Sequence, residues 1–189
     1  MIILASNSPR RKELMKEFIT PSFIIEPSNI DESIYQNEDP IKMSQLTAKA
    51  KGDYIHHKHP NDVIISADTI VVINNQIYGK PKDEEDAFKM IKSMCGKTHE
   101  VITSYYIIIK DKSILRSIAS AVTLKNVSDA IIRRYIKEYP PLDKAGSYGI
   151  QDKFFSENIL DKYEGSLTNI IGLPIEKITE DLRDFSVIS

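Results

Sequence analysis

The chain has 189 residues, 41% of them hydrophobic and 28% charged, with a formal net charge of −2. These values are typical of a soluble globular protein with one domain or two closely joined lobes. The near-neutral charge argues against extended binding to a nucleic-acid polymer. No apolar run approaches the roughly 20 residues that cross a bilayer, so we expect no membrane association. The single cysteine, Cys95, excludes an intrachain disulfide and a structural zinc cluster.

The N-terminus predicts a short strand over residues 1–5, a polar turn, and a helix that begins at Pro9 with Ser8 as its cap. Basic residues follow the apolar start, which is the reverse of a signal peptide, so we expect a cytoplasmic protein. Free N–H groups, the helix dipole and the guanidinium groups of Arg10 and Arg11 converge on one spot. Such a helix start can hold anionic oxygen, above all phosphate. The alternative is a capped surface helix with ordinary basic residues.

Strand and helix patterns then alternate. Residues 22–26 predict a strand and residues 28–38 a polar, acidic loop. A helix is predicted from Asp39-Pro40 to about His57, and Lys49 lies on its polar side. Its predicted apolar stripe consists of Met43, Leu46, Ala50 and Tyr54.

The middle of the chain predicts a strand over residues 63–73 that turns at Asn74-Asn75 into a second strand. The remaining expected elements are a helix capped by Asp83, a hairpin over 100–110 and 113–125, a helix from Ser128 to about Tyr139, a glycine-bearing loop over 145–149, one or two strands, and a helix after Pro174. Hairpins and crossover helices together indicate an α/β fold with a mixed, twisted sheet flanked by helices.

Asp68 is the strongest oddity of the sequence, because it lies in an apolar run that predicts a central strand. Aspartate is disfavoured in strands, and a buried carboxylate is costly unless it is paired or binds a metal. One interpretation is a break or bulge in the strand, with Asp68 making structural hydrogen bonds. The other is a carboxylate presented to a cleft as a metal ligand or general base.

Several further candidates are weak when taken singly. Lys80 lies between Gly79 and Pro81, Glu32 lies in the acidic loop, and Lys49 lies on a helix face. Taken alone, each is more commonly a solvated surface residue. The loop over residues 143–151 combines two glycines, an aromatic residue and polar groups. Such a loop can bend around a ligand and hydrogen-bond a base edge, although an ordinary structural loop has the same composition.

Taken together, these segments resemble the Maf family of nucleoside triphosphate pyrophosphatases. The resemblance covers nearly the whole chain and rests on motifs in family order: Leu4-Ala5-Ser6-Asn7-Ser8-Pro9-Arg10-Arg11, Ala67-Asp68-Thr69, Gly79-Lys80-Pro81, Gly96-Lys97-Thr98-His99-Glu100-Val101, residues 143–151 and Gly172-Leu173-Pro174. It implies one Maf-like domain over residues 1–189. The implied fold is that of inosine triphosphate pyrophosphatases, with two intertwined lobes on an elongated sheet and the nucleotide in a central cleft.

The resemblance also implies an activity, the hydrolysis of nucleoside triphosphates to monophosphate and pyrophosphate. Asp68 matches the catalytic position, and with Glu32 it would hold a divalent metal, Mg²⁺ or alternatively Mn²⁺. Arg10, Thr69 and Gln151 match the residues of the type that acts on dTTP and UTP rather than 7-methylguanosine triphosphate. The other residues expected to bind substrate are Ser6, Ser8, Arg11, Lys49 and Lys80.

Two departures from the family pattern are small. The helix that carries Lys49 matches loosely, and Cys95 stands where serine is usual. Two rival functions stay open: a nucleotide-binding regulator of cell division without significant turnover, and an enzyme for modified purine nucleotides. The expected partner is a small-molecule nucleotide, and a homodimer is compatible with the sequence.

Overall fold

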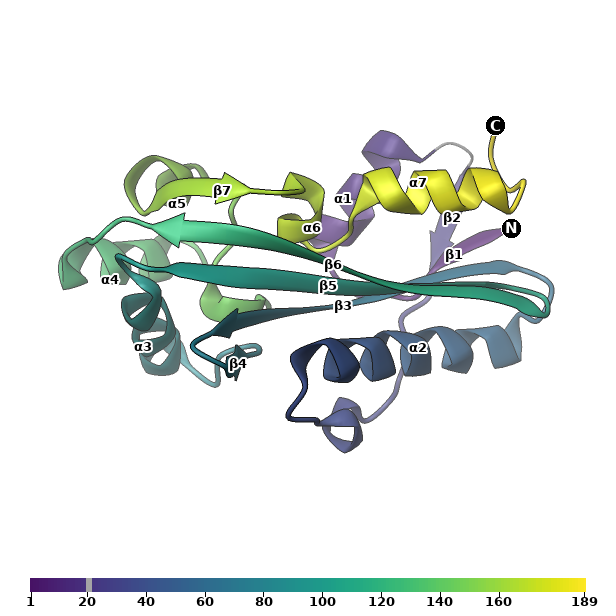
Figure 1. The fold of residues 1–189 in the computed structure, drawn as a ribbon, viewed down its shortest axis with the longest axis horizontal. Helices are drawn as coiled ribbons and strands as arrows, with labels where there is room; N and C mark the ends of the chain where they lie inside the picture. The colour runs from purple at the N-terminus through teal and green to yellow at the C-terminus, as the bar shows by residue number, and fades with distance from the viewer. Residues whose placement is uncertain (20–21) are drawn as a thin grey trace. The chain divides into compact units, whose positions relative to one another are not determined.

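In the computed structural model, which describes residues 1–19 and 22–189, helices flank a mixed seven-stranded sheet of order β2-β1-β3-β5-β6-β7, with β4 beside β3 (Figure 1). This architecture confirms the predicted α/β class. The chain divides into two compact units. The first comprises Met1–Asp68, Thr103–Ile118 and Gly172–Ser189, and the second comprises Thr69–Ile102 and Ala119–Ile171. Strands β3, β5 and β6 contribute residues to both units.

The first unit is built on a parallel group of strands in which β1 pairs with both β2 and β3. In Figure 1, α2 lies along one face of these strands, and α1 and α7 lie on the other. Its elements are β1 (Ile2–Leu4), α1 (Pro9–Phe18), β2 (Phe23–Ile25), the 3₁₀ turn η1 (Glu32–Tyr35), α2 (Pro40–Lys58), the start of β3 (Val63–Ile73), the hairpin end of β5 (Thr98–Ile109) and β6 (Lys112–Leu124), and α7 (Ile175–Asp184).

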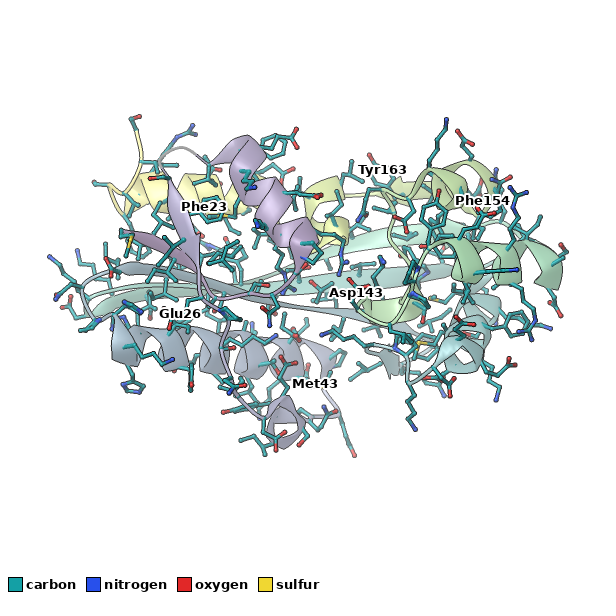
Figure 2. All side chains as sticks on the ribbon, turned by 180° about the vertical axis from the view of Figure 1, so that it is seen from behind. Phe23, Glu26, Met43, Asp143, Phe154 and Tyr163 are labelled. Carbon is teal, nitrogen blue, oxygen red and sulfur yellow. The ribbon has the colours of Figure 1, made fainter. Side chains whose placement is uncertain are left out.

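Helix α2 packs on the sheet through a partly polar face, so the predicted apolar stripe is only partly correct. Met43, labelled in Figure 2, is buried, but Leu46 is exposed. The buried face is Met43, Ser44, Thr47, Ala48, Lys51, Gly52 and Ile55. Its hydroxyl groups are hydrogen-bonded, with Ser44 Oγ 2.6 Å from Ser104 Oγ. Because hydrogen bonds remove the cost of burying these groups, hydrophobicity alone does not identify this face.

The second unit has its own apolar core. Its elements are the end of β3, β4 (Gln76–Tyr78), α3 (Glu84–Met94), the start of β5, the end of β6, α4 (Asp129–Glu138), the 3₁₀ turn η2 (Ala145–Ser147), α5 (Lys153–Asn158), β7 (Leu160–Glu164) and α6 (Leu167–Ile171). Asn74 and Asn75 have φ values of 48° and 62°, which confirms the predicted tight hairpin. The short helices α5 and α6 are too brief to give a periodic signal in the sequence.

A buried carboxylate attaches α7 to the sheet of the first unit. Asp181 is 1% exposed, accepts a 2.5 Å hydrogen bond from the Tyr105 hydroxyl, and is bound by the guanidinium of Arg116 at 2.9–3.1 Å. Burial opposes ionisation of Asp181, but the hydrogen bonds from Arg116 and Tyr105 outweigh it and lower the pKa of the carboxyl. The cluster therefore holds the C-terminal helix in place as long as Asp181 is ionised.

We expect Gly52→Ala to destabilise the fold, because a Cβ there would lie 2.5 Å from Tyr106 Cδ1 and 2.8 Å from Ser66 Oγ. The expected loss is about 1–3 kcal/mol, the usual cost of overpacking a filled interior. Gly79→Ala is the matched control, since a Cβ at Gly79 meets nothing within 4 Å. Urea unfolding followed by circular dichroism measures both variants. Equal stabilities for the two would contradict the tight packing of α2.

We expect Asp181→Asn to weaken the fold at neutral pH by about 2 kcal/mol, the scale of hydrogen bonds to a charged group. Because the folded-state pKa of Asp181 is lowered, its contribution is present above the unfolded-state pKa of about 3.9 and is lost as pH falls through the folded-state value. The stability difference between wild type and variant should therefore shrink in acid. A difference that is constant from pH 7 to pH 3 would refute this role.

Candidate active site

The loop between β1 and α1 fixes the side chain of Arg11. Ser8 caps α1 by accepting from the Arg11 backbone N–H, which confirms the predicted cap. Ser6 Oγ accepts from the Ser8 N–H at 3.1 Å and from Arg11 Nη1 at 3.4 Å, and Arg11 Nε donates to the Gly172 carbonyl at 2.7 Å. A guanidinium held at two of its nitrogens is oriented in advance of any ligand.

Asp68 lies within β3, which runs unbroken from Val63 to Ile73. The residues before it, Ser66 and Ala67, are completely buried, and the Asp68 side chain is 16% exposed. Of the two interpretations of the sequence, a break in the strand is therefore wrong. The strand carries its carboxylate in a mostly buried position, and the compensating charges lie on neighbouring elements.

Lys51 supplies the first of these charges. Its ammonium lies 3.4 Å from Asp68 Oδ1 and 3.0 Å from Glu32 Oε1, and its side chain is 11% exposed. The Lys51 ammonium nitrogen on α2 thus contacts one residue of η1 and one of β3, two elements that are distant in sequence. The arrangement brings the two predicted metal-binding carboxylates, Glu32 and Asp68, to the same cation.

Burial and neighbouring charges set the ionisation of Asp68 in opposite directions. Burial raises the pKa of its carboxyl and Glu32 raises it further, whereas Lys51 and Arg11 lower it, and the net result is a raised pKa. Burial also lowers the pKa of the Arg11 guanidinium, with Asp68 and Glu32 opposing this effect and Arg10 adding to it. The charges of Arg10, Arg11, Glu32 and Asp68 therefore act on one another within the first unit.

Lys49, the lysine predicted to bind substrate, contacts residues of the first unit other than Asp68. It forms an ion pair with Asp53 one helical turn away, and its ammonium lies 5.4 Å from the centre of the Tyr106 ring. The Asp53 hydrogen bond raises the pKa of Lys49. The structure brings Lys51 to Asp68, which sequence reasoning missed because the buried face of α2 is partly polar. The signal was present, since Lys51 follows Met43 and Thr47 at intervals of four residues and so shares their buried face.

The other predicted substrate-binding residues belong to the second unit. Thr69 directly follows Asp68 in β3 and is half-buried, whereas Lys80 and Gln151 are exposed. The loops that carry Lys80 and Gln151 are joined, because the Gly146 N–H donates to the Gly79 carbonyl at 3.1 Å. Gly146 has a φ of 70°, and a Cβ there would lie 2.7 Å from Val71 Cγ2, so only glycine suits this junction.

The donor set suits a metal that takes part of its coordination from its substrate. Within residues 1–19 and 22–189, no group of three or more His, Cys, Asp or Glu side chains could hold a metal ion. Glu32 and Asp68 offer hard carboxylate oxygens, and Mg²⁺ is usually bound by one or two carboxylates together with water and phosphate oxygens. Glu32 and Asp68 are therefore the two residues that could hold such a metal, and the metal itself stays a prediction.

None of the helices in the described part of the chain has the length and apolar character that a bilayer-crossing helix requires. The expected cytoplasmic location and homodimer stay predictions.

Known proteins match this chain over nearly its whole length. A family model described as "Maf-like protein" matches residues 1–185. The dTTP/UTP pyrophosphatase of Pyrococcus furiosus is 45% identical over 174 residues, which cover 92% of this chain and 90% of that protein. The dTTP/UTP pyrophosphatase of Acholeplasma laidlawii is 40% identical over 189 residues, which cover 100% of this chain and 98% of that protein.

A solved structure described as a HAM1 protein from Coxiella burnetii has a TM-score of 0.50 and 10% sequence identity, and the match covers 97% of this chain and 98% of that one. This likeness concerns the fold alone, and it agrees with the fold class expected from the sequence. The match of the family over almost the whole chain and the high identity to its curated members lead to one conclusion. The chain belongs to the Maf family.

Proposed function

We propose that this protein is a nucleoside triphosphate pyrophosphatase that acts on dTTP and UTP. The observation that carries the proposal is the buried carboxylate of Asp68 beside Lys51 and within the field of Arg11, with Glu32 on the same lysine. The relatives that are 45% and 40% identical are named dTTP/UTP pyrophosphatases, which supports the same reaction.

The cationic groups account for binding of the triphosphate. A nucleoside triphosphate carries about four negative charges near neutral pH, and further charge develops on the phosphoryl oxygens during the reaction. Arg11 is fixed by Ser6 and Gly172 before the substrate arrives, so it stabilises that charge without reorganising. Lys51, Arg10 and the start of α1 supply further positive charge and N–H donors within the first unit. Lys80 stays a predicted substrate-binding residue.

Asp68 and Glu32 are the residues that would hold the metal. A bound Mg²⁺ or Mn²⁺ would neutralise charge on the phosphate oxygens and help to orient them. Asp68 orients the attacking water and accepts its proton, the role of a carboxylate general base. The water oxygen attacks a phosphorus atom, and the bridging P–O bond between the α- and β-phosphates breaks. The products are nucleoside monophosphate and pyrophosphate.

Base selection is assigned to Gln151 and Thr69, with Arg10 as the third residue of the pyrimidine type. A glutamine amide offers a donor and an acceptor together, as the edge of a pyrimidine base requires. A base that leaves such polar groups unpaired loses about 1–3 kcal/mol for each. Two lost pairings correspond to a preference of roughly tenfold to ten-thousandfold.

The direct test is a panel of nucleoside triphosphates with Mg²⁺, assayed for pyrophosphate release with the monophosphate identified as co-product. We expect kcat/KM for dTTP and UTP to exceed that for ATP, GTP and 7-methylguanosine triphosphate. Equal values for purines and pyrimidines would contradict the base assignment alone. Tight nucleotide binding without turnover would favour the regulatory alternative.

We expect Asp68→Asn to lower kcat by at least about a hundredfold, as for loss of an acid–base group, while the circular dichroism spectrum stays unchanged. The substitution keeps the size of the side chain and removes its negative charge. Asp161→Asn, on the exposed surface of β7, serves as the control and should retain full activity. An Asp68→Asn enzyme within a few-fold of wild type would show that Asp68 is structural.

A pair of lysine variants on α2 tests which lysine serves the substrate. Lys51→Met should raise KM and lower kcat together, by about tenfold or more in kcat/KM, because one charge-assisted contact to the phosphates or to Asp68 is lost. Lys49→Met removes the same charge from the same helix at an exposed position and should change kcat/KM less than threefold. The reverse order of the two effects would restore Lys49 as the site residue.

A further inference from the structure

Gln151 lies in a tight turn of the second unit that is closed by a backbone hydrogen bond. The Asp152 N–H donates to the Gly149 carbonyl at 3.1 Å, so residues 149–152 form a turn with Gln151 as the third residue. Ile150, the second residue, is 4% exposed and belongs to the apolar core, whereas Gln151 is exposed. The turn thus buries one neighbour of Gln151 and presents Gln151 itself to solvent.

The hydroxyl of Tyr135 bridges the two ends of this turn. It accepts the Gly149 N–H at 2.9 Å and donates to Asp152 Oδ2 at 2.6 Å, so it bonds to the first and last residues of the turn. Tyr135 itself is fully buried on α4. Burial, and next the bond to Asp152, raises the pKa of its hydroxyl, which therefore stays a neutral O–H donor.

Aromatic packing fixes the position of that hydroxyl. The centre of the Tyr135 ring lies 5.3 Å from the ring centre of Phe155 and 6.4 Å from that of Phe154, which is labelled in Figure 2. Phe155 also stacks on Tyr148 at 4.4 Å, and Tyr148 lies just before the turn. The Tyr148 hydroxyl is 2.6 Å from Nε2 of the buried His99. The Tyr135 hydroxyl and Tyr148, which precedes the turn, are therefore both held by packed core side chains and cannot shift without disturbing the core.

We propose that Tyr135 is a positioning residue that sets the base selectivity of the enzyme by holding the Gly149–Asp152 turn and thus the Gln151 amide. The inference rests on the proposed function, because it assigns to Gln151 the reading of the pyrimidine edge. Hydrogen-bond discrimination between bases requires donor and acceptor at fixed positions, since misalignment weakens the bond steeply. A turn free to move would let the amide adapt to a purine as well.

Tyr135→Phe tests the proposal, because it removes the hydroxyl and keeps the ring. The measured quantity is the ratio of kcat/KM for UTP to kcat/KM for GTP, which does not depend on the fraction of folded enzyme. We expect this ratio to fall about tenfold, the size expected when one hydrogen-bonded support is lost. A merely structural role would reduce both values equally and leave the ratio unchanged.

Tyr139→Phe is the matched control. The Tyr139 ring stacks on Tyr135 at 5.4 Å, and removing its hydroxyl should leave the ratio at the wild-type value. Asp152→Ala removes the other partner of the Tyr135 hydroxyl and should lower the ratio in the same direction, which keeps the test valid if Tyr135→Phe folds poorly. In a Gln151→Ala background, Tyr135→Phe should change the ratio no further, because the two act as one unit.

The outcomes separate this inference from the proposed function. A wild-type enzyme that cleaves UTP in preference to GTP, with the same ratio in Tyr135→Phe and Asp152→Ala, overturns the role of Tyr135 and leaves the proposed function intact. A further fall of the ratio in the Gln151→Ala background also overturns it, because Tyr135 would then act through another group. A wild-type enzyme without base preference overturns both the base assignment and this inference.

Discussion

The rest of the site depends on the two ion pairs that the Lys51 ammonium forms with Glu32 and Asp68. Asp68 lies in a strand whose preceding residues are completely buried, and an ionised carboxylate there is unfavourable without a partner. Lys51 reaches it because α2 lies close to the sheet at Gly52, where a side chain would clash with Tyr106. The position of Lys51 beside Asp68 thus depends on the close packing of α2 against the sheet.

Arg11 is the second cation that acts on the carboxyl of Asp68. Its guanidinium is bound by Ser6 and by the Gly172 carbonyl, so the turn after β1 and the segment before α7 both determine its orientation. Both cations lower the pKa of Asp68, and neither is strong enough to cancel the effect of burial. The carboxyl of Asp68 therefore keeps a raised pKa in the metal-free protein, although both cations favour its ionised form.

Much of the fold could be predicted because its signals are local. The Ser8 cap, the Asn74-Asn75 hairpin and the long strand around Asp68 all depend on residues close together in sequence. The choice between Lys49 and Lys51 could not be made, because it depends on which face of α2 meets the sheet, and that face is partly polar. The hydroxyl of Tyr135 on the Gln151 turn was also missed, since α4 and the turn are brought together only by tertiary packing.

Burial raises the pKa of Asp68, and Lys51 lowers it. The most direct test is an NMR titration of the Asp68 side-chain carboxyl carbon in the metal-free protein and in Lys51→Met. We expect a midpoint above the ordinary aspartate value of about 3.9 in the wild type, and a still higher midpoint in Lys51→Met. An ordinary midpoint that is the same in both proteins would contradict it.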